Sequence, residues 1–403
     1  MVQTKALAHP LGLKIVTGGF IGFWSLLAAF PLAWIVLMSV KLPLDAFADD
    51  PLQVVVGYGT LAERGGISIA GIAIFLAAGW AVWLLVTRRA RKLVRAIAPG
   101  SLAPLGWLAV SVLCVAGCAV AFWWLVPALV RAVEAALSAI PGLRLLSKPI
   151  LGLTTEHYRA VWFGYGFYRN FINSLVITFG TVAISLTVGT LAGYGLARAN
   201  SSLAFWLLIA ALIFRALPHS VLVTGYLPAF INSRALLMPL WNAPLLGPVL
   251  HLFSDAPPTL YGQPLAVIMV LVSINQPFTI WMLRSFFQNI PQELDEAARV
   301  DGCSHFGAFW RVIMPVMWPG VITTGLFSFL LAYNDYLVCS LLLDAQSQTM
   351  VPAITGFFNR ETTTTDQVQA VAAAVSITAP LFLLVMVFQK QLVSGLTAGA
   401  VKG

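Results

Sequence analysis

Long apolar segments separated by short polar stretches form the main pattern of this sequence. A helix that crosses a membrane needs about 20 apolar residues, and eight windows have this character. They are Ile15–Val40, Ile67–Thr87, Leu105–Val130, Phe171–Ala197, Leu203–Pro228, Leu265–Met282, Val321–Leu343 and Val371–Phe388. Because the sequence lacks the alternating pattern of a membrane β-barrel, we expect these windows to be helices. The pattern predicts an all-α polytopic membrane protein with about eight transmembrane helices.

The charged residues beside these windows predict how the chain is oriented. Residues 1–14 carry two lysines and no acidic residue, and five basic residues lie within residues 88–95. Basic flanks favour the cytoplasmic side, so both segments are expected inside. The second is either a topological anchor or a specific lipid site. The acidic segment 41–66 and the loop 230–264 are expected outside, the latter as a re-entrant or interfacial piece. An even number of helices then places both termini in the cytoplasm.

The composition leaves little room for other kinds of protein. The chain is 59% hydrophobic and 9% charged, so few residues remain for a water-soluble domain. We attribute the net charge of +8 to the cytoplasmic flanks and not to nucleic acid binding. Cys114 and Cys118 share a face of one predicted helix, either as small buried side chains or as two neighbouring thiols. No disulfide framework and no metal-ligand spacing is visible in the sequence, and we expect this chain to bind no cofactor.

A polar stretch from Glu293 to Pro319 interrupts the apolar pattern. Five charged residues fall within its first nine positions, in the order Glu293, Asp295, Glu296, Arg299 and Asp301. A segment of this polarity between two membrane helices must lie in water. We therefore expect it to meet a soluble partner.

Local sequence signals within this stretch predict a helix, a turn and a second helix. Pro291 suits the first helical position, and the acidic residues that follow suit the positive end of a helix dipole. Gly302 can adopt positive φ and stop the first helix, and Ser304 can cap the second. Pro315 and Pro319 are expected to end the element before the next apolar window.

The second helix has a regular apolar spacing. Large apolar side chains recur at steps of three and four residues, at Phe306, Phe309, Trp310 and Ile313. Residues at this spacing in an α-helix lie on the same side. We therefore expect the four side chains to share one face.

The polar stretch resembles the EAA loop of ABC importer permeases. In that loop Glu-Ala-Ala is followed by three residues, a glycine, about nine more residues and an Ile-x-Leu-Pro word. The matching positions are Glu296, Ala297, Ala298, Gly302, Val312, Met314 and Pro315. The tail Gly395–Gly403 is similar to that of MalG-type subunits of the carbohydrate-uptake branch. The alternative is an ordinary cytoplasmic helical hairpin.

The resemblance implies a six-helix MalG-like permease core, and it covers roughly Ile15–Lys41 and Thr154–Gly403. The second and third predicted helices are then a two-helix insertion after the first core helix. The implied organisation is residues 1–41 for the N-terminal tail and first core helix, 42–150 for the inserted hairpin, and 151–403 for the core with its EAA loop at 287–319.

The resemblance also implies a function and partners. The chain would be a transmembrane permease subunit of a bacterial cytoplasmic-membrane importer, translocating a sugar or polyol by alternating access. Its implied partners are a second, MalF-like permease, a homodimeric ABC ATPase and an extracytoplasmic solute-binding protein. ATP and Mg²⁺ would be used by the ATPase partner, since no Gly-x-x-x-x-Gly-Lys-Ser/Thr phosphate loop occurs in this sequence. The chain itself is then not an enzyme.

The resemblance assigns roles to named residues. Glu296 would supply charge to the ATPase cleft, Gly302 the bend, and the three aromatic residues apolar anchors. The full implied docking set is Glu293, Glu296, Ala297, Ala298, Asp301, Gly302, Phe306, Phe309, Trp310 and Pro315. Gly399, Lys402 and Gly403 of the tail are implied to reach the interface of the ATPase dimer.

Polar residues inside the apolar windows are candidates for a gate or a substrate pathway. Arg215 lies mid-window, and Asn275 and Gln276 precede Pro277, a combination that suggests a broken helix beside a pathway. Pairing between neighbouring helices is the alternative for all three polar side chains. The word formed by Tyr333, Asn334, Asp335 and Tyr336 resembles the family's Trp-Asn-Asp/Glu-Phe word, and Asp335 is expected to face water or a partner.

The sequence supports two other functions less well. An ion-coupled carrier that works without an ATPase would need paired ionisable residues and inverted repeats, and the sequence offers few such residues and no evident repeat. A membrane-embedded enzyme would need a metal-binding or nucleophilic motif within the windows, and none occurs in the sequence. The identity of the sugar and the role of the inserted helices do not follow from the sequence.

Overall fold

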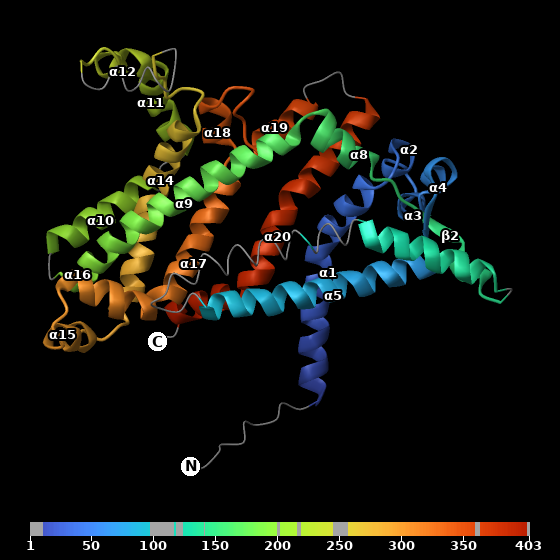
Figure 1. The fold of residues 1–403 in the computed structure, drawn as a ribbon, viewed down its shortest axis with the longest axis horizontal. Coiled ribbons are helices and arrows are strands. Elements are labelled where there is room, and N and C mark those ends of the chain that lie inside the picture. The colour runs from blue at the N-terminus through green and yellow to red at the C-terminus, as the bar shows by residue number, and fades with distance from the viewer. Residues whose placement is uncertain are drawn as a thin grey trace. The chain divides into compact units, whose positions relative to one another are not determined.

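Helices make up almost all of the described structure, as Figure 1 shows. The computed structural model describes residues 11–96, 117, 124–140, 142–199, 202–215, 219–244, 257–358 and 363–400. The chain divides into two units, which we call the N-terminal unit (residues 1–73, 130–164 and 357–376) and the core unit (residues 74–129, 165–356 and 377–403).

The N-terminal unit begins with one long helix and continues with short elements. Its elements are α1 (Leu11–Ser39), α2 (Pro43–Ala46), α3 (Pro51–Val56), α4 (Tyr58–Arg64), β1 (Gly66–Ser68), α7 (Arg144–Ser147), β2 (Pro149–Gly152), α8 (Glu156–Arg159) and a π-helical turn (Ala160–Gly164). Strands β1 and β2 form an antiparallel ribbon with Gly66 opposite Gly152. The sequence does not predict this ribbon, because strands of three and four residues are too short to show an alternating pattern.

The core unit is built from long helices. Those within it are α9 (Phe167–Arg198), α10 (Ser202–Arg215), α11 (His219–Ile231), α12 (Ser233–Trp241), α14 (Pro264–Gln288), α15 (Glu293–Val300), α16 (His305–Ala308), a π-helical turn (Phe309–Ile313), α17 (Met314–Tyr333) and α18 (Leu337–Leu342). Three further helices have residues in both units, namely α5 (Ile69–Ala96), α19 (Met350–Phe358) and α20 (Thr364–Ala400).

Four helical segments among the described residues are long and apolar enough to cross a membrane. They are Gly12–Ser39, Phe167–Arg198, Pro264–Gln288 and His305–Tyr333, and α11 with α12, bent by 40°, raises the number to five. The expected window Leu105–Val130 lies mostly outside the described residues, and so do Cys114 and Cys118. The described part of the chain is therefore a helical membrane protein, as the hydropathy pattern predicted.

Helix α1 is apolar on every side. None of its most apolar window is buried within this chain, and Pro31 lies inside the helix without ending it. A helix with no polar face is suited to hydrocarbon surroundings. Its exposed surface is therefore the surface expected of a transmembrane helix that meets lipid or another membrane subunit.

The chain forms a buried network of polar side chains directly after α1. The Lys41 ammonium donates hydrogen bonds to the carbonyl oxygens of Val55 (2.9 Å), Val56 (3.1 Å) and Gly152 (2.6 Å). Lys41 is fully buried, and a buried ammonium is tolerated only when its donors are satisfied. These three bonds tie the end of α1 to α3 and β2.

A carboxylate and an imidazole complete this polar network. Asp45 accepts hydrogen bonds from the backbone nitrogens of Gly59 (3.1 Å) and Thr60 (2.5 Å) and from the Thr60 hydroxyl (2.7 Å). Nε2 of His157 lies 3.0 Å from the Lys41 carbonyl oxygen, and because a carbonyl only accepts, the ring nitrogen donates. Burial lowers the pKa of His157 from its usual 6.5.

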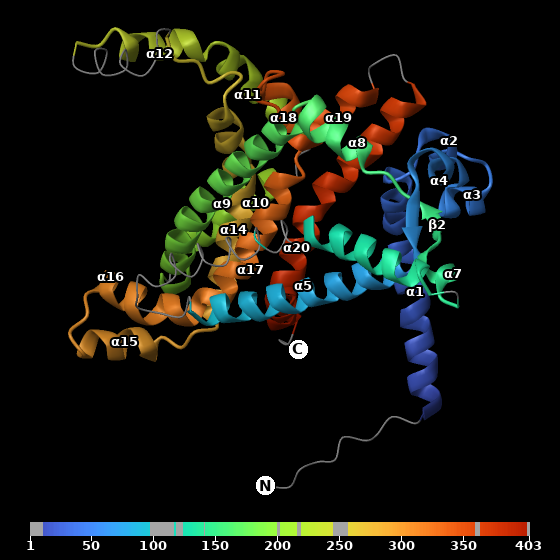
Figure 2. The same ribbon diagram turned by 45° about the vertical axis from the view of Figure 1, so that its right-hand side comes forward.

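In the core unit, helices α9, α14 and α17 pack against one another, as Figures 1 and 2 show. A side chain added at Gly193 of α9 would place its Cβ 3.1 Å from the backbone nitrogen of Arg284 in α14, and one at Gly189 would come within 2.6 Å of Thr279. Small residues allow such close approach where lipid gives no hydrophobic drive. Both glycines are therefore sites of close contact between α9 and α14.

Two expectations about helix ends are wrong. Helix α14 continues through Pro277 to Gln288 instead of breaking, because one missing backbone donor is tolerated in a membrane helix that neighbours support. The expected window Val321–Leu343 instead divides after Tyr333, and α18 begins at Leu337. A hydropathy window cannot detect this turn because the residues on both sides of it are apolar.

We expect this polar network to lose stability in acid. The pKa of His157 is lower in the folded chain than in the unfolded chain, so the unfolded state binds more protons as the pH falls through 6.5. The stabilisation is therefore present above this pH and is lost below it. Hydrogen exchange of residues 41–60, corrected for intrinsic rates, should be faster at about pH 5 than at about pH 7.5.

The variant His157→Gln is the control for this experiment. Its amide can donate to the Lys41 carbonyl but does not titrate in this range. Equal acid sensitivity of the variant and the natural chain would contradict the assignment to His157.

Candidate functional site

Helices α15 and α16 form a short loop with a sharp turn between them. Gly302, in the turn, has φ of +87°, and a side chain there would meet no atom within 4 Å. The turn therefore needs glycine for its backbone conformation and not for space. The Ser304 side chain accepts a hydrogen bond from the Gly307 backbone nitrogen (3.1 Å), as an N-cap does. The predicted stop and cap are both confirmed.

The boundaries of the loop differ from the prediction at both ends. Helix α15 begins at Glu293, two residues after Pro291, whose carbonyl accepts from the Leu294 nitrogen (3.4 Å). Pro315 and Pro319 do not end the second helix. It runs from His305 without a break to Tyr333. Pro315 follows closely after the π-helical turn Phe309–Ile313 and lies inside this continuous helix.

The four apolar residues of the second helix do not share one face. Phe306 and Trp310 are 66% and 63% exposed, whereas Phe309 is 3% exposed and Ile313 is fully buried. Residues Phe309–Ile313 form a π-helical turn. A π turn holds more residues than an α turn, so the spacing used in the sequence analysis no longer applies there.

The exposed and buried pairs have different surroundings. The rings of Phe306 and Trp310 stack with centroids 6.5 Å apart and planes 11° apart. The ring of Phe309 lies 4.8 Å from that of Tyr194 and 6.4 Å from that of Phe287. Phe309 was expected to be a surface anchor, but within this chain it is a core residue that joins the loop to α9 and α14.

Most of the other expected docking residues lie on the surface of the loop. The exposed ones are Glu293, Glu296, Ala297, Asp301 and Gly302. Ala298 is buried and Pro315 is half-buried. The loop therefore presents an acidic helix α15 beside one exposed aromatic pair.

An ionic clamp, defined by Tyr194, Arg198 and Asp295, joins this loop to the end of α9. The Asp295 carboxylate accepts hydrogen bonds from the Tyr194 hydroxyl (2.6 Å) and from Nε of Arg198 (2.8 Å). Nη2 of Arg198 also lies 2.8 Å from the carboxylate. Nη1 of Arg198 donates to the carbonyls of Phe287 (3.3 Å) and Ile290 (3.2 Å), where α14 ends.

The sequence shows the charge of Asp295 but does not predict the clamp. Arg198 and Asp295 are 97 residues apart in the sequence, so no local pattern connects them. The only available signal was an acid in a first helical turn that would have to be buried.

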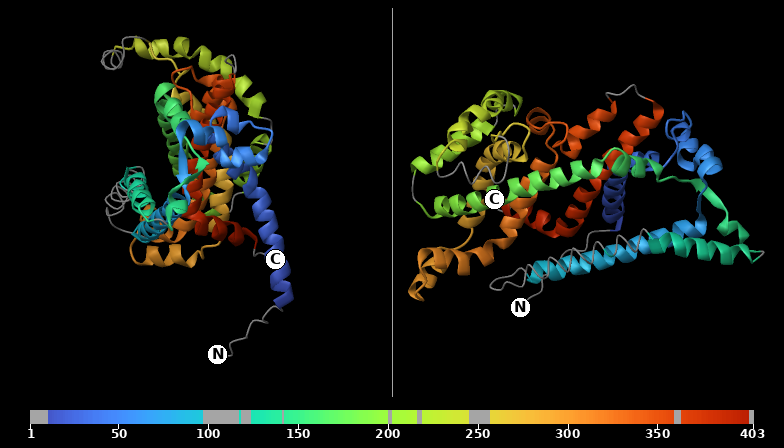
Figure 3. Two further views of the ribbon diagram at one scale, coloured as in Figure 1. Left: turned by 90° about the vertical axis from the view of Figure 1, so that its right-hand side faces the viewer. Right: turned by 45° about the horizontal axis from the view of Figure 1, so that its top comes forward.

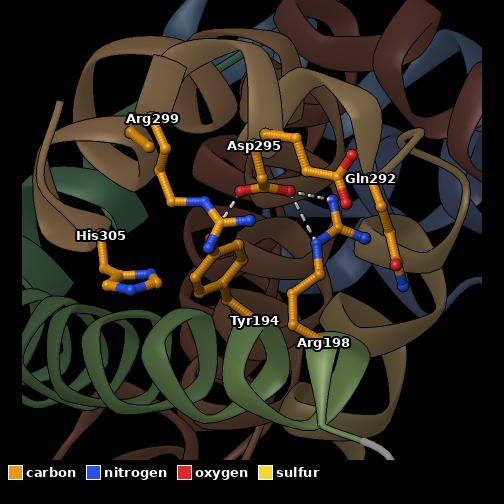
Figure 4. A pocket seen from close by; sticks show the side chains of 8 residues that line it. Tyr194, Arg198, Gln292, Asp295, Arg299 and His305 are labelled. Atoms are coloured by element: carbon orange, nitrogen blue, oxygen red, sulfur yellow. Dashed lines mark hydrogen bonds and ion pairs between the residues drawn. The ribbon is translucent and has the colours of Figure 1, made fainter. Parts of the chain in front are cut away.

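A polar cavity of about 260 Å³ lies beside the clamp, as Figure 4 shows. Its walls come from α9, α15 and α16, and the lining side chains are Tyr194, Arg198, Gln292, Asp295, Glu296, Arg299, His305 and Ala308. Both acidic and basic groups face it. No group of three or more metal-ligating side chains occurs among the described residues.

Among the pathway candidates, the structure gives Asn275 and Gln276 partners on neighbouring helices. Asn275 is buried and donates to the Ser328 hydroxyl of α17 (2.7 Å), and Nε2 of Gln276 lies 3.4 Å from the Ser185 carbonyl of α9. Arg215, the last residue of α10, lies with its guanidinium 4.6 Å from the centre of the Phe278 ring. Helix pairing therefore accounts for the contacts of these side chains in this structure.

The Tyr-Asn-Asp-Tyr word begins at Tyr333, the last residue of α17 and of its span, and its other three residues form the turn before α18. Tyr333 is buried and donates to the Ile377 carbonyl (3.2 Å). Asp335 accepts hydrogen bonds from the backbone nitrogens of Val338 and Cys339 and so caps α18. Asn334 and Tyr336 are exposed.

The tail is described only in part. Gly399 lies in the last turn of α20. Lys402 and Gly403 lie outside the described residues, so their expected role at an ATPase interface stays a prediction.

Comparison with known proteins identifies the family. Residues 185–397 match the family model described as "Binding-protein-dependent transport system inner membrane component". This range contains the loop, the clamp and all of the pathway candidates. The family also accounts for a chain that is membrane-embedded and has no phosphate loop.

Three curated relatives have similar sequences. The trehalose transport system permease protein SugB of Mycobacterium tuberculosis is 31% identical over 62% of this chain and 83% of its own length. The diacetylchitobiose uptake system permease protein DasC of Streptomyces coelicolor is 34% identical over 62% and 82%. The sulfoquinovosyl glycerol transport system permease protein SmoH of Agrobacterium fabrum is 31% identical over 74% and 94%. This chain belongs to the family of binding-protein-dependent transport system inner membrane components, the permease subunits of ABC importers.

Proposed function

We propose that this chain translocates a sugar or polyol across a bacterial cytoplasmic membrane. The names of the three relatives refer to trehalose, diacetylchitobiose and sulfoquinovosyl glycerol, all of which carry a carbohydrate unit. An extracytoplasmic binding protein delivers the solute, and a second, MalF-like permease completes the membrane pathway. The size of the sugar depends on that permease and on the binding protein as well.

The proposed topology has eight transmembrane helices with both termini in the cytoplasm. Six form the permease core and two, within residues 42–150, form an insertion after the first. Four to five candidate spans occur among the described residues, and the expected third helix lies mostly outside them. The expected second and eighth helices lie in α5 and α20, which are not among these candidates. The basic run at 88–95 supports the orientation.

The surface of the α15–α16 loop is the proposed docking site for a homodimeric ABC ATPase. The observation that carries this proposal is the exposed, stacked pair Phe306 and Trp310 beside the exposed Glu296. Exposed aromatic residues on a polar loop are typical anchors of protein interfaces. The other side of the same helix, at Phe309 and Ile313, is buried in the core unit, so the loop can bind a partner without losing its attachment.

The attachment gives a mechanism for coupling. From His305 to Tyr333 the chain is one continuous helix, so a displacement of the docked aromatic pair is passed to a transmembrane helix through covalent helix geometry. The ATPase partner binds ATP and Mg²⁺ and supplies this displacement. Alternation between inward-facing and outward-facing states then moves the sugar. The tail residues Gly399, Lys402 and Gly403 are proposed to reach the interface of the ATPase dimer.

Arg215, Asn275, Gln276 and Tyr333–Tyr336 remain proposed pathway residues. A hydrogen bond such as that of Asn275 to Ser328 (2.7 Å) can hold two helices in one state of the cycle and be exchanged in another. The exposed Asn334 and Tyr336 offer amide, hydroxyl and ring groups that suit a sugar.

Removal of the exposed aromatic pair should detach the ATPase. We expect Phe306→Ala with Trp310→Ala to lower the ATPase that co-purifies with the permease by about tenfold or more, because interface aromatics carry much of the binding energy. The melting temperature of the permease in detergent should stay unchanged, since both side chains are exposed. Full recovery of the ATPase with the double variant would contradict the docking site.

Phe309→Ala tests the part that this buried side chain has in folding, apart from docking. Because Phe309 is buried, this change should cost about 3–5 kcal/mol of stability and lower the melting temperature. Phe163→Ala, at an exposed phenylalanine of the N-terminal unit, is the control. It should change neither the stability nor the melting temperature.

Transport itself is tested with the assembled importer. Proteoliposomes that contain both permeases and the ATPase should hydrolyse ATP faster with sugar-loaded binding protein and should accumulate that sugar. Glu296→Lys and Gly302→Asp should abolish uptake while the permease remains in the membrane, because one reverses the docking charge and the other places a side chain at φ of +87°. Uptake that needs no ATP would contradict the proposed function.

A further inference from the structure

We propose that Tyr194 and Arg198 are positioning residues that make α9 move with the docking loop, through their contacts with Asp295. This inference rests on the proposed function of the loop. It adds α9 to α17 as a second transmembrane helix that moves with the loop. Helix α17 is joined to the loop by the chain itself. Helix α9, green in Figure 3, is joined to it by the ionic clamp that Figure 4 shows.

The attachment of α15 to the rest of the core unit is narrow. Of the eight residues in this helix, Asp295 and Ala298 are the buried ones. Ala298 has one methyl group, so it offers little resistance to sliding. Each of the two carboxylate oxygens of Asp295 has a partner in α9, one the Tyr194 hydroxyl and the other the Arg198 guanidinium. Displacement of α15 must therefore either move the end of α9 or break these bonds.

The clamp is suited to transmitting force because of its burial and its geometry. The side chains of Arg198 and Asp295 are 17% and 12% exposed. A pair this shielded from water is stronger than a surface pair, and loss of one partner leaves the other charge uncompensated. Two of the Arg198 nitrogens lie 2.8 Å from the same carboxylate oxygen, and Tyr194 holds the other oxygen.

Arg198 also sets the position of α9 relative to α14. Its Nη1 donates to the carbonyl of Ile290 and to that of Phe287, which also accepts from the Ile290 backbone nitrogen. One guanidinium thus holds the end of α14, the end of α9 and the start of α15 together. The polar cavity of about 260 Å³ that Arg198, Asp295 and Tyr194 help to line gives this corner space to change shape.

The experiment compares uptake per ATP hydrolysed in the assembled importer. Asp295→Asn and Arg198→Gln leave the docking residues Glu296, Phe306 and Trp310 untouched, so the ATPase should still co-purify and hydrolyse ATP. Uptake per ATP should fall by about tenfold, a size usual for coupling between sites. The exchanged pair Asp295→Arg with Arg198→Glu should recover part of the loss.

Several controls separate transmission from simple structural support. Glu156→Gln removes one partner of an exposed ion pair in the N-terminal unit and should leave uptake per ATP unchanged. Tyr194→Phe removes one of the hydrogen bonds and should give a smaller loss than Asp295→Asn. Assembled variants with natural uptake per ATP would overturn the proposal, and so would single variants that fail to assemble while the exchanged pair does not recover.

A distance measurement tests the joint movement directly. Spin labels at the exposed positions Leu191 on α9 and Val300 on α15, in a cysteine-free background, should give the same distance with and without ATP. In Asp295→Asn the distance should change on ATP binding. An equal change in the natural chain would overturn the proposal even where the ATPase docks as expected. A natural chain that recruits no ATPase at all would overturn both the proposed function and this inference.

Discussion

A charged carboxylate that is shielded from water must have partners, and this constraint on Asp295 organises the end of the permease core where the loop is attached. The first turn of α15 favours an acid because of the helix dipole, but the adjacent Glu293 and Glu296 satisfy that preference in water. Asp295 instead points inward to Tyr194 and Arg198. The same helix therefore has an acidic outer face for a partner and one buried acid that fixes its position.

Helix continuity is the second constraint. In hydrocarbon a backbone group without a partner is costly, which favours unbroken helices even where the sequence contains proline. Pro277, Pro315 and Pro319 all lie inside helices of the described chain. The consequence is mechanical, because an unbroken helix from His305 to Tyr333 connects a water-exposed aromatic pair to the middle of the helix packing.

The features that could be predicted from sequence are those decided within a few residues. The roles of Gly302 and Ser304 follow from the chemistry of helix ends. The split between Phe306 and Phe309 could not be predicted, since it depends on a π turn and on which side the rest of the core unit covers. The pairing of Asp295 with Arg198 joins residues 97 positions apart, and the bond from Asn275 to Ser328 joins two spans. Such contacts are set by the fold and leave no periodic signal.

The two attachments of the loop differ in a way that matters for a transporter. The covalent link to α17 cannot be released, so any movement of the docking surface must reach that helix. The clamp to α9 is strong only while Asp295 and Arg198 stay shielded, and a polar cavity open to water lies beside them. Hydration through this cavity would weaken the pair, because an ion pair loses most of its strength in a high dielectric. The core therefore contains one covalent and one non-covalent connection to the same surface, and α9 moves with α17 only because the clamp stays shielded.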